Sequence, residues 1–291
     1  MFSMTGYGRG RVEGQWGRLS LEISSVNHRY QEISVRLPRD MSRWEPWFHL
    51  KLRPLFNRGK VTCRVEANWG PSSGAGHLNL ELMSSIYGEV KRLSSQLGAP
   101  LGPVTDLLQV PGVMESPMGF MDEGEAEGIL EGLLRMAVED WNRMRQAEGE
   151  YLWGEILRRL GSFRSCVDRI SRVWGDRMEM AFRQARERVE EMLAGLGASL
   201  DESRWAQELV IMADRWDVSE ELSRLGSHVE QFLAVRDLKG PVGKRLDFIV
   251  QEMNREVNTL GSKVNDPEIR SLVVDAKSAL EAVREQIQNL E

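Results

Sequence analysis

The sequence predicts an α+β protein, in which a small mixed α/β domain at residues 1–120 precedes a predominantly helical region with long antiparallel helices at residues 121–291. Two observations predict this class. Apolar and polar residues alternate through much of the first 70 residues, which is the two-residue period of β-strands. After residue 121, apolar residues recur every three or four positions, as on one face of an α-helix, and proline is rare.

The first 70 residues contain the expected strands. Two segments, Trp16 to Val26 and Tyr30 to Leu37, alternate clearly, and Asn27 and His28 form a tight connection between them. Trp44 to Leu55 has the spacing of an amphipathic helix, and a turn at residues 58–60 leads into a further strand, Val61 to Asn68. Three or four strands and one helix make a small α+β domain.

The middle of the chain is expected to connect this domain to the helices. Gly70 to Gly76 has the composition of a flexible loop, Leu80 to Leu97 reads as a helix, and Pro100 to Pro117 is a connector with short helical turns. The helices expected after it are Glu123 to Gln146, a long stretch through Leu196, Glu202 to Trp216, two at residues 217–233 and 243–263, and Pro267 to Leu290. The last has near-heptad apolar spacing, which predicts packing against another helix.

The helices at residues 217–233 and 243–263 are central to the prediction because each has a buried stripe and a varied polar face. The apolar stripes are Val218, Leu222, Leu225, Val229, Phe232 and Leu233 on the first, and Leu246, Ile249, Val250, Met253, Val257 and Leu260 on the second. The polar faces carry Asp217, Glu220, Glu221, Arg224, Ser227 and His228, and Arg245, Glu252, Arg255, Glu256, Thr259 and Lys263. If the helices pack antiparallel through a short connection around residues 239–243, these faces line one cleft.

Charge is distributed unevenly along the chain. The net charge is −6, yet residues 1–70 carry twelve Lys and Arg against six Asp and Glu, which leaves a net of −12 in the remainder. This asymmetry suits a protein that holds phosphates with one part and supplies carboxylates with another. Attraction between the two parts, within a chain or between subunits, is the alternative explanation.

The composition also indicates where in the cell the protein is expected to be. The first residues lack the apolar run of a signal peptide, and no segment has the length of apolar sequence that a membrane span needs, so a cytoplasmic protein without membrane contact is expected. Cys63 and Cys166 are isolated, which predicts neither a disulfide framework nor a zinc knuckle.

Several motifs in this chain occur together in one known family. They are SMTGYGRG, EISSVNHRYQEISVRLPR, RGKVTCRVE, DVSEELSRLGSHVEQF, EMNREVNTLGSK and REQIQNLE, and they extend from the first residues to the last. In order and spacing they resemble the signatures of the YicC/YloC family of bacterial proteins. The resemblance implies a cytoplasmic endoribonuclease that binds RNA, depends on a divalent metal (Mn²⁺ or Mg²⁺) and assembles as a homo-oligomer, expected to be a ring-shaped hexamer.

Two chemistries could cleave RNA here, and the sequence leaves both open. In the first, carboxylates of Glu220, Glu221, Glu252 and Glu256, with His228 as a nitrogen ligand, hold a divalent metal that activates water. In the second, the ribose 2′-hydroxyl attacks its own phosphate, and His228 acts with Glu221 or Glu256 as general base and acid. Glutamate pairs and single histidines on helices are more often ordinary surface or core residues.

A basic set in the N-terminal domain is expected to bind RNA. It comprises Arg9, His28, Arg29, Arg36, Arg39, Arg58 and Lys60, and Tyr7 and Tyr30 are available to stack on unpaired bases. Arg224, Arg255 and Lys263 are the expected RNA ligands on the acidic helices, where arginine offers a fork of donors to phosphate. Arginines that protect an edge strand against aggregation would give the same N-terminal pattern.

The sequence therefore predicts a homo-oligomeric RNA clamp that cuts single-stranded or structured RNA at its acidic helices. One alternative is a nonenzymatic adaptor that binds RNA and presents it to other RNA-decay factors. Another is a structural assembly protein in which the polar stripes are subunit contacts. The alternatives differ in what happens when the four glutamates become glutamine: loss of cleavage, no effect, or dispersal of the oligomer.

Overall fold

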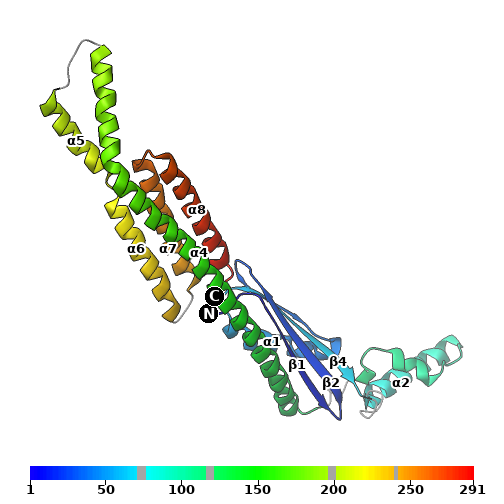
Figure 1. Cartoon of the computed structure of the whole chain (residues 1–291). Helices are drawn as coiled ribbons and strands as arrows, with labels where there is room; N and C mark the ends of the chain where they lie inside the picture. The colour runs from blue at the N-terminus through cyan, green and yellow to red at the C-terminus, as the bar shows by residue number, and fades with distance from the viewer. Residues whose placement is uncertain (71–76, 116–120, 196–200, 239–241) are drawn as a thin grey trace. The chain divides into compact units, whose positions relative to one another are not determined.

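The structure is a computed structural model that describes residues 1–70, 77–115, 121–195, 201–238 and 242–291. It divides into two compact units, Phe2–Glu148 and Gly149–Glu291, with Met1 counted in the second. The first unit holds a β-sheet and the second is helical, which confirms the predicted α+β class (Figure 1). Among the described residues, no helix has the length and apolar character needed to span a membrane.

The first unit is built on a four-stranded sheet with the order β1-β2-β4-β3. Its strands are β1 (Gly6–Gly14), β2 (Gly17–Val26), β3 (Gln31–Arg36) and β4 (Gly59–Trp69). Neighbouring strands are antiparallel except β3 and β4, which are parallel. The chain crosses between those two through the short helices η1 (Arg39–Trp44), α1 (Glu45–Leu52) and η2 (Arg53–Leu55). The connection predicted at Asn27 and His28 therefore links strands that are not neighbours, because β4 lies between them.

The first part of helix α4 (Glu123–Gly195) covers the inner face of this sheet. Strand β1 makes this possible, because Gly8 and Gly10 lie on its buried side, where the helix backbone approaches closely. A Cβ atom at Gly8 would lie 2.2 Å from the carbonyl oxygen of Ala137, and one at Gly10 would lie 2.3 Å from that of Leu133. Any side chain at these positions would force the helix away from the sheet.

A small ribbon and a helix follow the sheet in the first unit. They are β5 (His77–Leu78), α2 (Leu80–Leu97), the 3₁₀ helix η4 (Val104–Gln109) and β6 (Met114–Glu115). The predicted helix Leu80 to Leu97 has these bounds, and the predicted connector contains η4. Residues 71–76 of the predicted loop, and Pro117 of the connector, lie outside the described residues.

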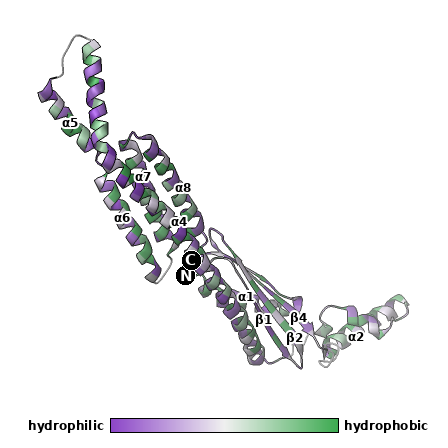
Figure 2. Cartoon of the chain, viewed as in Figure 1, coloured by the Kyte–Doolittle hydropathy of each residue, from purple (hydrophilic) through white to green (hydrophobic). Residues whose placement is uncertain are grey.

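The second unit packs the later part of α4 with four further helices. They are α5 (Glu202–Trp216), α6 (Ser219–Ala234), α7 (Gly243–Lys263) and α8 (Pro267–Ile287), and a 3₁₀ turn, η5 (Val235–Asp237), follows α6. The apolar residues of α6, α7 and α8 meet α4 in one core. Each of these helices mixes hydrophobic and hydrophilic residues along its length, as amphipathic helices do (Figure 2).

Helix α4 is longer than predicted. The sequence indicated two helical stretches, Glu123 to Gln146 and one continuing through Leu196, whereas α4 is a single helix of 73 residues, and Leu196 lies outside the described residues. The predicted domain boundary at 120/121 falls just before α4, while the two compact units divide within it, at 148/149. Residues 121–148 therefore belong to the unit of the sheet, because their apolar side chains form its core.

Candidate functional site

The two predicted signature helices, α6 and α7, lie side by side in the helical unit. Ion pairs join Glu221 on α6 to Lys263 on α7, and Arg224 on α6 to Glu256 on α7. Residue numbers rise on one helix as they fall on the other, so the helices are antiparallel, as predicted. Residues 239–241 of the predicted connection lie outside the described residues.

Glu221 is the most unusual residue of this site, because its carboxylate is buried. The residue is only 5% exposed, and its Oε1 atom lies 2.7 Å from the ammonium nitrogen of Lys263. Lys263 also donates a hydrogen bond of 2.8 Å to the backbone oxygen of Asp217. The second carboxylate oxygen of Glu221 is buried and has no hydrogen-bond partner among the residues that the structure describes. A buried acceptor without a hydrogen bond is costly, so this oxygen is an unusual feature of the site.

Arg224 connects a buried carboxylate to an exposed one. Its Nη1 atom lies 3.3 Å from Oε1 of Glu256, which is buried, and its Nη2 atom lies 2.5 Å from Oε1 of Glu220, which is exposed. The hydrogen bond to Glu256, together with the charges of both carboxylates, raises the pKa of Arg224 above its ordinary value. The guanidinium is therefore a permanent cation at the centre of the site.

His228 and Glu252 lie one helical turn further along. His228 follows Arg224 by four residues on α6, and Glu252 precedes Glu256 by four residues on α7. The antiparallel register therefore places the two at the same level. The Nδ1 atom of His228 is buried and has no hydrogen-bond partner in the described part of the chain.

The predicted metal ligands do not form a ready-made cage in the described part of the chain. No group of three or more His, Cys, Asp and Glu side chains there is placed to hold a metal ion. Glu220, Glu221 and Glu256 are each paired with a cation. Magnesium is commonly held by one or two carboxylates together with substrate phosphates, a mode that does not require a cage of protein ligands. Metal binding stays a prediction.

The predicted RNA ligands are distributed over both units. Arg224 and Lys263 belong to the ion pairs described above, while Arg255 is an exposed residue of α7. In the other unit, Arg9 and Arg36 are exposed on strands β1 and β3.

His28, Arg29 and Lys60 lie where β2 leads into β3 or at the start of β4. Arg39 begins η1, and Arg58 donates a hydrogen bond of 3.0 Å to the backbone oxygen of His28. Lys60 lies 2.5 Å from Oε1 of Glu32. The Arg29 guanidinium lies over the Tyr30 ring, 5.3 Å from its centre, and His28 Nδ1 is 3.9 Å from Glu32. This local cluster is only partly basic, because one carboxylate serves two of its side chains.

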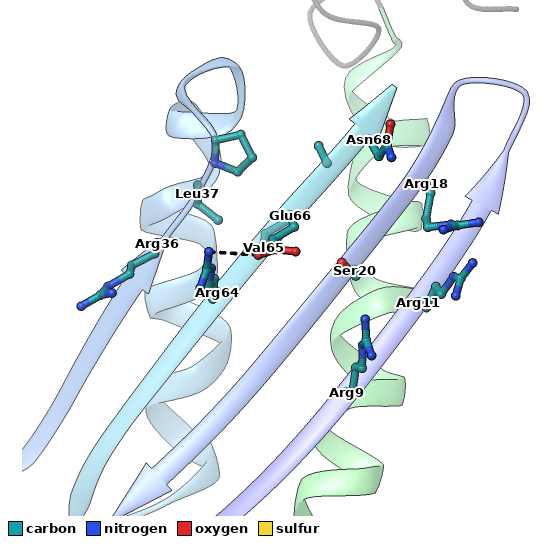
Figure 3. A pocket seen from close by; sticks show the side chains of 12 residues that line it. Arg9, Arg11, Arg18, Ser20, Arg36, Leu37, Arg64, Val65, Glu66 and Asn68 are labelled. Atoms are coloured by element: carbon teal, nitrogen blue, oxygen red, sulfur yellow. Dashed lines mark ion pairs between the residues drawn. The ribbon is translucent and has the colours of Figure 1, made fainter. Parts of the chain in front are cut away.

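Three arginines that the sequence analysis did not select share a groove with Arg9 and Arg36. Arg11, Arg18 and Arg64 extend from β1, β2 and β4 into it (Figure 3). The strand alternation could have identified them, because Leu19, Leu21 and Ile23 are buried and the even-numbered residues of β2 must then face solvent.

Comparisons with known proteins place the whole chain in one group. Residues 1–153 match a family described as "Endoribonuclease YicC-like, N-terminal region", and residues 170–291 match "Endoribonuclease YicC-like, C-terminal". A Haemophilus influenzae protein named "Probable endoribonuclease YicC" is 35% identical over 295 residues, covering 100% of both chains. A Clostridioides difficile protein of the same name is 32% identical, covering 99% of each.

Proposed function

Because the chain belongs to the YicC-like endoribonuclease family, we propose that it is a cytoplasmic endoribonuclease that cleaves RNA at the charge cluster between α6 and α7. The observation that carries this proposal is the buried carboxylate of Glu221, which has one oxygen paired with Lys263 and the other unpartnered. Buried ionised groups are normally fully paired, so a buried carboxylate with one unpaired oxygen marks a candidate functional site.

The cluster supplies the groups that phosphodiester cleavage needs. Arg224 and Lys263 are cations beside the carboxylates, and they stabilise the negative charge that develops on a phosphate. Glu221 accepts a proton or orients the attacking hydroxyl or water through its unpartnered oxygen. His228, one turn from Arg224 on α6, would act with Glu221 or Glu256 as general acid and base for attack by the 2′-hydroxyl, as predicted from the sequence.

Metal dependence is part of the proposal. Glu220, Glu221 and Glu256 outnumber Arg224 and Lys263, so the cluster keeps a net negative charge that attracts a cation. Glu221 and Glu256 would hold a divalent ion, with Glu220, Glu252 and His228 as the further predicted ligands. When bound, such an ion activates water and neutralises phosphate charge. The chain's own part is to place the buried carboxylates beside the cations that orient the RNA.

The test is cleavage of a labelled single-stranded RNA by the purified full-length protein with Mn²⁺, with Mg²⁺ and with EDTA. Glu221→Gln should abolish cleavage, since glutamine keeps the shape of the side chain and removes its charge. Glu230→Gln is the matched control, because Glu230 is an exposed residue of the same helix. Cleavage that persists in Glu221→Gln would refute the assignment. Activity that survives EDTA would favour 2′-hydroxyl attack over metal-dependent hydrolysis.

A nonenzymatic RNA adaptor is the second candidate, and one observation favours it. Each of Glu220, Glu221 and Glu256 forms an ion pair with Arg224 or Lys263, as in a purely structural cluster. In that case the wild-type protein binds the labelled RNA and leaves it intact under every metal condition. Other RNA-decay factors would then perform the cut.

We further propose that the protein works as a homo-oligomer, a hexamer, that clamps RNA. Support comes from helix α2, which has no buried residue and exposes Leu80, Leu93 and Leu97. Apolar side chains gathered on one helix suit contact between subunits. Native mass spectrometry should find a hexamer in the wild type and smaller species after Leu93→Glu and Leu97→Glu. A wild-type monomer would contradict the proposal, including its structural-assembly alternative.

A further inference from the structure

Five arginines line a groove on the solvent face of the β-sheet. They are Arg9, Arg11, Arg18, Arg36 and Arg64, here called the arginine face, and the groove encloses about 790 Å³ (Figure 3). The opposite face of the sheet is covered by α1 and α4. Each arginine comes from a regular strand, so the backbone fixes the spacing of their guanidinium groups.

The strand register arranges these side chains in rows. Arg9 on β1 is opposite Glu22 on β2, Glu22 is opposite Arg64 on β4, and Arg64 is opposite Arg36 on β3. Arg11 lies two residues further along β1, which places it about 6.6 Å beyond Arg9. A line of cations at such intervals can contact successive phosphates of one extended strand.

The carboxylates on this face do not cancel its charge. Arg11 and Arg18 share a single carboxylate, that of Glu13. Arg64 lies 3.0 Å from Glu66. Exposed pairs of this kind contribute little stability, so a phosphate can replace the carboxylate.

Two arginines of the same row, Arg9 and Arg36, have weaker contacts with carboxylates than Arg11, Arg18 and Arg64 have. Arg9 is 3.9 Å from Glu22, beyond hydrogen-bonding distance. Arg36 forms no ion pair with any residue that the structure describes. Guanidinium groups in this state are ready to donate two parallel hydrogen bonds to a phosphate.

The row next to Arg9 and Arg36 adds a platform for bases. Tyr7, Ser24, Thr62 and Ser34 are opposite one another across the four strands. Tyr7 is 42% exposed, so its ring is available for stacking on an unpaired base, and its neighbours are small hydroxyl side chains that leave room. Cations beside a single exposed tyrosine ring fit a single strand better than a duplex, whose bases are already stacked.

From this arrangement we infer that the arginine face binds the sugar–phosphate backbone of single-stranded RNA, with Arg36 and Arg64, which are opposite each other on β3 and β4, among its ligands. The inference rests on the proposed function for the choice of RNA, and it assigns the substrate a binding surface separate from the residues that cut it. Phosphate contacts carry little sequence information, so binding here is permissive. The other occupant with suitable charge is an acidic surface of a second copy of this chain.

The experiment measures binding of a fluorescein-labelled single-stranded RNA to the full-length protein in EDTA, by anisotropy, over a range of salt concentrations. The double variant Arg36→Gln, Arg64→Gln is compared with Arg53→Gln, Arg135→Gln. The control arginines are exposed, belong to η2 and α4 on the covered side, and form no ion pair in the described part of the chain. Both variants change the net charge equally.

The arginine-face variant should bind at least about tenfold more weakly in low salt, and its slope of log affinity against log salt should fall by about 1.4, or 0.7 for each lost phosphate contact. The control should match the wild type. Equal losses in both variants would overturn the inference, since net charge alone would explain them. Unchanged RNA binding with a smaller oligomer would assign the face to a second copy of the chain. Absent cleavage in the wild type would refute the nuclease and leave this result standing.

Discussion

The Glu221–Lys263 ion pair gives the sharpest test of the structure, because removing the lysine leaves the buried Glu221 carboxylate without a counter-ion. Lys263→Met would leave the Glu221 carboxylate, which is 5% exposed, without a counter-ion. Breaking a buried ion pair from one side costs about 3–5 kcal/mol. Since the Lys263 side chain is 27% exposed and water reaches it, we expect the lower end, about 3 kcal/mol.

The second half of the test also removes the charge of Glu221. Adding Glu221→Gln to Lys263→Met should recover most of the loss, to within about 1 kcal/mol of the wild type, because a neutral amide is far less costly to bury than a carboxylate. Lys244→Met is the control, since Lys244 is exposed on the same helix and its loss should change stability by less than about 0.5 kcal/mol.

Urea unfolding followed by far-UV circular dichroism measures all four proteins, and the midpoints are compared at constant slope. If Lys263→Met unfolds at the same urea concentration as Lys244→Met, the carboxylate is not buried as described. If the double variant is as unstable as Lys263→Met alone, the loss comes from the lysine's hydrogen bond to Asp217 and not from the charge of Glu221.

Three further predictions concern other parts of the molecule. Gly8→Ala should destabilise the sheet unit by about 3 kcal/mol or more in urea unfolding, because the new Cβ would lie 2.2 Å from a helix carbonyl oxygen. The control Gly88→Ala, which has open space around it, should be neutral or stabilising. Similar urea midpoints for the two variants would contradict the packing of α4 on the sheet. Burial raises the pKa of the Cys63 thiol to about 12, so a thiol reagent should modify only Cys166 in the native protein at pH 8 and both in urea, and rapid modification of two thiols would refute this. The backbone amide of Ser219, which begins α6, donates to Asp217 and holds the pKa of that carboxyl below its ordinary value. The Asp217 carboxylate therefore stabilises the fold at pH values above its unfolded pKa of about 4, and this stabilisation is lost as the pH falls through the lower folded pKa. In Asp217→Asn the free energy of unfolding should depend less on pH in this acid range, and an unchanged pH dependence would exclude the contribution.

Helices with a clear apolar period were predictable from the sequence. Every residue predicted for the buried stripe of α7 is buried. The near-heptad apolar positions of the last predicted helix are buried too: Ile269, Leu272, Ala276, Leu280, Val283, Ile287 and Leu290. These stripes pack against other helices along their whole length, so local spacing and tertiary burial agree.

Strand β1 was not predicted as a strand, and the reason is physical. Its buried positions include Gly6, Gly8 and Gly10, which contribute no apolar side chain to the alternation. The backbone of α4, more than 120 residues away in the sequence, leaves no room for a side chain at Gly8 or Gly10. The parallel pairing of β3 with β4 is equally non-local, since it depends on where the chain crosses the sheet and not on either strand alone.

The residues of the candidate site were predictable from the sequence, but which of their side chains are buried was less so. Helical spacing placed Glu221 on the polar face of α6 and Leu233 on its apolar stripe, whereas Glu221 is buried and Leu233 is 41% exposed. The face of α6 that is covered depends on the angle at which α7 and α4 approach it, and apolar periodicity does not encode that angle. A buried carboxylate opposite a lysine of another helix is therefore visible only in three dimensions.

The contacts of Arg224 indicate how the charge cluster between α6 and α7 can bind a phosphate and keep its other ion pairs. Its bond to Glu256 joins it to a buried carboxylate and orients the guanidinium, while its bond to Glu220 joins two exposed side chains that solvent screens. A phosphate that approaches from solvent competes only with Glu220, the weaker partner. Arg224 can exchange that carboxylate for substrate and keep its anchor to Glu256, so the site stays organised when RNA arrives. A cluster built only for stability would have no need of one shielded and one exchangeable partner on the same arginine.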